Sequence, residues 1–258
     1  MISIPLAPFL IWIMVFMRVI AVITFFPLFG ENFIPLRVRV LMAAVIAIAL
    51  CPVAPVSAAM FPASIPGFIR LVLTETLLGF GLGLIGKILF AIVQFSGQLA
   101  GEQMGFGIVN AIDPTGSHQV SVVAEMLYVM SILIFLTSGI HRAFISVLAQ
   151  SFSTLPPGGA TLSPDVVRFM MRLGRTLFEL SVRFAMPVIL IIFAINVGLG
   201  LIARAVPQIN VFMESFPLRI MAGLAVLMLS LGVTVSLYQG MFEGLEGLMT
   251  QLVKLMKG

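Results

Sequence analysis

Long apolar runs alternate along this chain with short polar or proline-rich stretches. The apolar runs cover residues 4–29, 40–56, 68–95, 122–138, 186–203 and 216–237. About 20 apolar residues are enough for a helix to cross a bilayer, so the longer runs predict membrane-spanning helices. The run 40–56 is interrupted at Pro52 and Pro55. This second run therefore suits a hairpin or a tilted helix better than a clean span.

Residues 97–121, which we call the central segment, break the apolar pattern. The central segment is rich in glycine and contains Glu102, Asp113 and His118. Irregular polar backbone exposed to lipid is strongly unfavourable, because its hydrogen-bonding groups find no partners there. We therefore predict a loop that is buried in protein or lines an aqueous path.

A polar helix face is predicted after the loop at residues 155–163. Ser163 can cap the helix, with Pro164 at its first position and Asp165 in its first turn. Helical spacing then places five charged residues on one face: Arg168, Arg172, Arg175, Glu179 and Arg183. We expect this face to meet water, lipid headgroups or a partner. A voltage sensor is disfavoured, because an acid lies in register with the arginines.

Composition makes the membrane interpretation firm. The chain is 60% hydrophobic and 9% charged, whereas soluble domains contain about 25% charged residues. One soluble core cannot hide so much apolar surface, so we predict an all-α integral membrane protein. The net charge of +4 fits positive flanks of apolar segments, and we expect no nucleic-acid partner.

Charged residues within or beside the apolar runs are the first candidates for a site. We predict that Arg18, Glu75, Glu102 and Glu125 are buried charges. An arginine at a bilayer centre costs about 2.5–3.5 kcal/mol on insertion scales, so Arg18 should face protein or water. A structural ion pair and a place in a conduction path both remain open. A proton relay through the acids and Asp113 is a further alternative to simple pairing.

The sequence offers little for an enzyme. His118 and His141 have no second ligand at metal spacing, and Cys51 is the single cysteine. No phosphate-binding loop with a GK[ST] ending is present. We expect no catalytic residue, metal or cofactor.

Several separated motifs together resemble one family. The motifs are FPLFGENFIPLRVR (26–39), GEQMGFGIVNAIDPTGS (101–117), LIFLTSGIHRAFISVLAQSFSTLPPG (133–158), NVGLGLIARAVPQINVF (196–212) and FPLR (216–219). In this order and spacing, over nearly the whole chain, they resemble the FliR family of flagellar export-gate subunits. The injectisome counterparts of that family are known as SctT.

The resemblance implies a fold and partners. It implies one integral membrane domain over residues 1–258, with bent helical hairpins in a FliP-like half and a FliQ-like half around a central lumen loop. It implies assembly with FliP and FliQ, association with FlhB and FlhA, and passage of unfolded flagellar export substrates. The location implied is the basal body in the bacterial inner membrane. An injectisome SctT-type subunit is the alternative within the family.

The resemblance also gives the central segment a role, as a plug of the closed pore. The matching positions, which we call the plug segment, are Met104, Gly105, Phe106, Gly107, Ile108, Val109, Asn110, Ala111, Ile112, Asp113 and Pro114. The residue types agree, because glycine permits non-helical backbone and apolar constrictions can gate by dewetting. Outside the family, a secondary transporter with its site at this broken segment is a further alternative.

Overall fold

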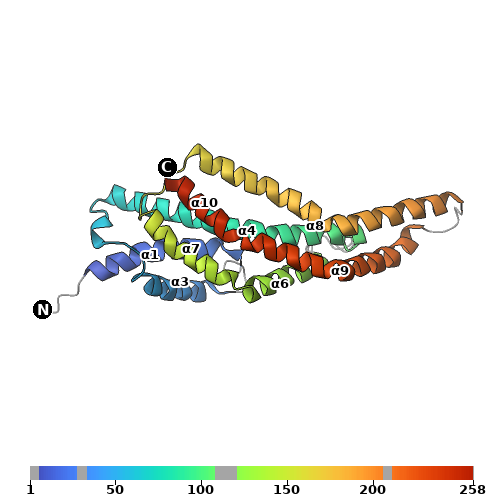
Figure 1. Cartoon of the computed structure of the whole chain (residues 1–258), viewed down its shortest axis with the longest axis horizontal. Coiled ribbons are helices and arrows are strands. Elements are labelled where there is room, and N and C mark those ends of the chain that lie inside the picture. Colours follow the sequence, from blue (N-terminus) through green and yellow to red (C-terminus); the bar gives the residue numbers. More distant parts are fainter. Residues whose placement is uncertain (1–5, 28–33, 108–120, 206–210, 258) are drawn as a thin grey trace. The chain divides into compact units, whose positions relative to one another are not determined.

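All regular structure in the described part of the chain is helical. The computed structural model describes residues 6–27, 34–107, 121–205 and 211–257. Its elements are α1 (Leu6–Phe25), α3 (Leu36–Leu50), the 3₁₀ turn η1 (Ala58–Met60), α4 (Ile65–Met104), α6 (Val122–Thr137), α7 (Ile140–Thr154), α8 (Pro164–Ala205), α9 (Val211–Glu243) and α10 (Leu245–Lys257). Figure 1 labels the α-helices. The predicted all-α class is confirmed.

Within the described residues, four stretches of helix are long and apolar enough to cross a membrane. They are Ala7–Phe25, Ile65–Met104, Pro164–Ala205 and Glu214–Lys257. Helices α6 and α7 form a fifth candidate, bent by 67° at their junction. The chain is thus an all-α membrane protein by the length and composition of its helices.

Helix boundaries differ from the predicted pattern, most clearly in α3, α8 and α4. The run 40–56 yields only the 15-residue α3, about 22 Å long at 1.5 Å per residue, which is too short to span. The run 186–203 is part of α8, whose 42 residues continue through Pro187. The central segment begins as helix, because α4 extends to Met104. In each case the apolar pattern marked the apolar core of an element and missed its ends.

The chain divides into two compact units that interleave along the sequence. Unit 1 comprises Met1–Ile88, Gly139–Gly174 and Phe242–Gly258, and unit 2 comprises Leu89–Ser138 and Arg175–Met241. Helices α4 and α8 each contribute to both units. The units are therefore not consecutive halves of the sequence.

Glycines allow α1 and α4 to pack closely in unit 1. A Cβ added at Gly83 would lie 2.7 Å from the Cβ of Phe25, and one added at Gly86 would overlap the ring of Phe26. Any larger residue would push the helices apart. Helix α3 packs on the same α1, where the Trp12 indole donates to the Ala44 carbonyl at 3.5 Å.

The carboxyl end of α10 joins the start of α8 in unit 1. The Thr161 amide donates to the Met256 carbonyl at 2.9 Å, and the Ser163 hydroxyl donates to the Leu255 carbonyl at 3.3 Å. Ser163 also accepts from the Val166 amide at 3.4 Å. The predicted cap of α8 is confirmed, and it also satisfies carbonyls that α10 leaves unpaired.

Unit 2 has an aromatic and hydroxyl core at the end of α4. Phe90 packs against Tyr128 and Phe135 of α6, with ring centroids 6.0 and 5.5 Å apart. The Ser181 hydroxyl of α8 donates to the Ile92 carbonyl at 3.1 Å. Along α8 and α9, by contrast, large apolar side chains are exposed, among them Phe193, Val197, Leu201, Met221, Met228, Leu229 and Val233. Such surface requires a cover of lipid or of other subunits.

Candidate functional sites

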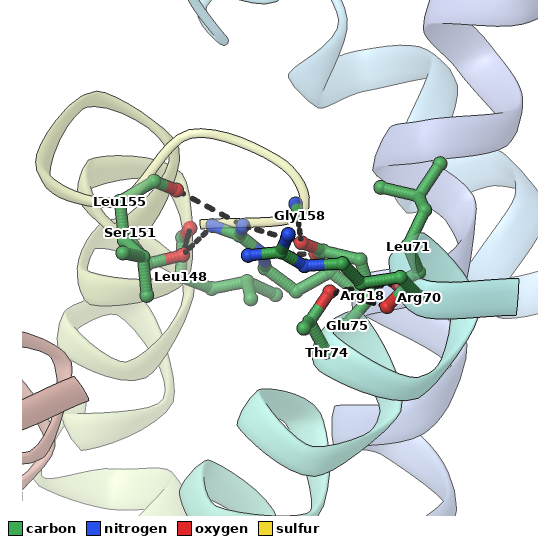
Figure 2. Close-up of polar contacts among 9 residues, drawn as sticks. All are labelled: Arg18, Arg70, Leu71, Thr74, Glu75, Leu148, Ser151, Leu155 and Gly158. Atoms are coloured by element: carbon green, nitrogen blue, oxygen red, sulfur yellow. Dashed lines mark hydrogen bonds and ion pairs between the residues drawn. The ribbon is translucent and has the colours of Figure 1, made fainter. Parts of the chain in front are cut away.

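A fully buried ion pair joins α1 to α4 in unit 1. The Arg18 Nε lies 2.6 Å from Glu75 Oε2, and Arg18 Nη2 donates to Glu75 Oε1 at 3.0 Å. Both side chains are 0% exposed. Figure 2 shows the guanidinium turned toward the Glu75 carboxylate. The two-point geometry uses the planar fork that only arginine provides.

The remaining hydrogen-bonding groups of Arg18 and Glu75 bond to α7 and to the loop that follows it. Arg18 Nη1 donates to the Ser151 hydroxyl, and Nη2 donates to the Leu155 carbonyl, both at 3.0 Å. The Gly158 amide donates to Glu75 Oε1 at 3.0 Å. The Arg18 guanidinium carbon also lies 4.1 Å from the centroid of the Phe152 ring. Arg18 and Glu75 are satisfied by each other and by neighbouring groups, so the geometry favours the structural ion pair over a conduction path.

The two other predicted buried charges are exposed instead. Glu102 lies on the outer face of the last turn of α4, where it accepts from Gln98 Nε2 at 2.8 Å. Glu125 is exposed in the first turn of α6, a position at which the helix dipole favours an acid. Both acids belong to unit 2 and Glu75 to unit 1. Asp113, the fourth member of the proposed relay, lies outside the described residues.

Helix α4 ends at the start of the plug segment in a defined cap. Gly105 has φ +98°, a conformation open mainly to glycine. The Gly105 amide donates to the Glu102 carbonyl and the Phe106 amide to the Gly101 carbonyl, both at 3.0 Å. These two bonds form a Schellman motif. Met104 is buried, and Gly105, Phe106 and Gly107 are half-buried. The plug residues from Ile108 to Pro114 lie outside the described residues.

The two described ends of the central segment contact each other beside α4. Gln98 Oε1 accepts from the Ser121 amide at 2.9 Å, just before α6. A Cβ at Gly97 would lie 2.6 Å from the Ala124 Cα, and one at Gly101 would overlap the Ser121 hydroxyl. Gln98, Gly101 and Ser121, which we call the loop base, therefore hold both ends of the segment together. The spacing of Gly97 and Gly101 is a sequence signal that could have indicated this close contact.

The charged face of α8 is exposed as predicted. All five of its residues are exposed: Arg168, Arg172, Arg175, Glu179 and Arg183. Arg168 pairs with Asp165 at 2.7 Å within unit 1, and Arg175 pairs with Glu179 at 2.6 Å within unit 2. Among the described residues, no group of three or more His, Cys, Asp or Glu could hold a metal ion.

Comparison with known proteins gives the family. The profile of bacterial export proteins, family 1, matches residues 9–245. The chain is 32% identical to the flagellar biosynthetic protein FliR of Pectobacterium carotovorum subsp. carotovorum over 241 residues, 92% of each chain. It is 28% identical to the FliR of Escherichia coli K12, covering 92% of this chain and 90% of that one, and 28% identical to the FliR of Bacillus subtilis 168, covering 90% of each. The chain belongs to the FliR family of bacterial export proteins.

Proposed function

We propose that this protein is a subunit of the flagellar type III export gate in the bacterial inner membrane. In this proposal it assembles with FliP and FliQ, associates with FlhB and FlhA, and helps to form the channel for unfolded flagellar substrates. The observation that carries the proposal is the match to flagellar FliR proteins over nine-tenths of the chain. The exposed apolar helices of unit 2 support it, because they offer surface for neighbouring subunits.

The plug role of Met104–Pro114 is the finer part of the proposal. Met104 and Phe106 bring apolar bulk to the start of the segment. The Schellman cap at Gly105 and the loop base fix both places where the segment leaves the helices. A segment with fixed ends can fill or leave a pore without unravelling the helices beside it.

The test removes the apolar bulk and measures the membrane barrier. Deleting residues 105–112 should leave assembly with the partner subunits intact, because the loop base remains. Idle cells should then leak ions and small solutes. Replacing residues 105–112 with glycine and serine at the same chain length is the matched control for chain connectivity. Cells with this variant should leak as well. Normal impermeability of cells that contain an assembled deletion variant would contradict the plug role.

Two alternatives from the sequence make different predictions. A transporter with its site at the central segment would have to use an exposed acid such as Glu102, because Arg18 and Glu75 are occupied by each other. Native mass measurement after mild detergent extraction separates the cases: a hetero-oligomer with FliP-like and FliQ-like subunits supports the gate, and a monomer or homodimer supports the transporter. Restored motility in a flagellar FliR deletion strain separates the flagellar subunit from the SctT type.

A further inference from the structure

We infer that Phe216 and Gly223 of α9 form a seat that positions the start of the plug segment. The inference rests on the proposed plug role and concerns unit 2 alone. The sequence motifs GEQMGFG and FPLR lie more than 100 residues apart. The structure brings their residues into contact at the end of α4.

The first half of the seat is a notch at Gly223 that holds Met104. Met104 is the last residue of α4 and is fully buried. A Cβ added at Gly223 would lie 2.5 Å from the Cγ, 2.7 Å from the Sδ and 2.8 Å from the Cε of Met104. The whole outer part of the side chain thus lies against the backbone of α9. A side chain at position 223 would force Met104 out of this place.

The second half of the seat is the Phe216 ring against Gly105. A Cβ added at Gly105 would lie 2.8 Å from Cδ1 and 3.0 Å from Cε1 of Phe216. Glycine is needed at position 105 for its positive φ as well. The ring therefore rests on the backbone at the one place where the chain turns out of α4.

The seat decides the direction in which the plug segment leaves. The Schellman bonds orient Gly105 and Phe106 relative to α4, and the Phe216 ring blocks one side of Gly105. Pro217 follows directly inside α9 and removes a helical hydrogen bond there. The residues of α9 that precede Pro217, Phe216 among them, are thus less tightly bound to the rest of the helix than in an unbroken helix. A shift of these residues would move the ring and free the start of the plug segment.

The test truncates the ring and leaves the plug segment untouched. Phe216→Ala in the full assembly should make idle cells leak to an extent comparable with the 105–112 deletion, while Phe216→Leu restores most of the barrier. Phe9→Ala is the control, since Phe9 is an exposed phenylalanine of α1 that belongs neither to the seat nor to the apolar faces of α8 and α9. It should leave the barrier intact. An assembled Phe216→Ala gate that stays tight, while the deletion leaks, overturns the seat and leaves the plug role standing. A tight deletion variant overturns the plug role itself.

A second measurement covers the case in which Phe216→Ala does not assemble. Met104→Cys combined with Gly223→Cys, in a Cys51→Ser background, should form a disulfide under mild oxidation of idle cells. Failure of the assembled double variant to cross-link would overturn the seat, because the two positions would then not be in contact.

Discussion

Two segments of this chain are held against α4 by opposite chemistry. In unit 1, the buried pair of Arg18 and Glu75 holds the loop after α7 through charged hydrogen bonds at Leu155 and Gly158. In unit 2, the described residues of the central segment are held by close glycine contacts and by a neutral hydrogen bond that the Ser121 amide donates to Gln98. If a buried ion pair such as Arg18–Glu75 opens, it leaves a buried charge unpaired. Neutral contacts leave no such charge, so they fit the movement that we propose for the plug segment.

Breaking the buried Arg18–Glu75 pair should have the largest effect on stability. Arg18→Met strands the Glu75 carboxylate in a dry site, and losing one partner of a buried pair costs about 3–5 kcal/mol. We expect a loss of folded protein, measured as steady-state amount and as denaturant stability in detergent. The double variant Arg18→Met with Glu75→Met should lose less than the sum of the single variants. Additive losses would contradict mutual pairing.

Filling the loop base should have an intermediate effect. Gly101→Ala places a methyl group against the Ser121 hydroxyl, and overpacking of this kind costs about 1–3 kcal/mol. The same stability measurement, with hydrogen exchange at the Ser121 amide, should show a loosened base. Gly240→Ala is the control, because a Cβ there meets nothing within 4 Å. Equal effects at both positions would show that helix propensity, and not the close contact, decides the outcome.

Breaking an exposed ion pair in unit 1, the unit that also contains Arg18 and Glu75, should have the smallest effect on stability. Arg168→Gln removes the pair with Asp165, whose side chains are 66% and 61% exposed. Exposed pairs contribute about 0.2–1 kcal/mol. Stability in detergent should therefore barely change. A loss of stability as large as that of Arg18→Met would mean that solvent exposure does not explain the difference between the two ion pairs.

The candidate site was partly predictable from single positions. Arg18 and Glu75 lie inside long apolar runs, where an unpaired charge facing lipid is costly, so their burial in protein was expected. Glu102 and Glu125 lie at helix ends, where one turn has both an outer and an inner face. Hydropathy averages over that turn, which is why the prediction of burial was wrong for these two. The seat at Phe216 and Gly223 was missed, because nothing local in FPLR refers to Met104.

The sequence by itself determined the membrane class, the helical content, the family and the polar face of α8. These follow from composition and from periodicities within one element, which depend on residues close together in the chain. The tertiary structure alone decided that Glu75 is the partner of Arg18, that Gln98 closes the loop base, and that Phe216 rests on Gly105. Each of these contacts joins positions 23 or more residues apart. The packing of helix backbones, which is close at the glycines of α4, determines which distant side chains come into contact with that helix.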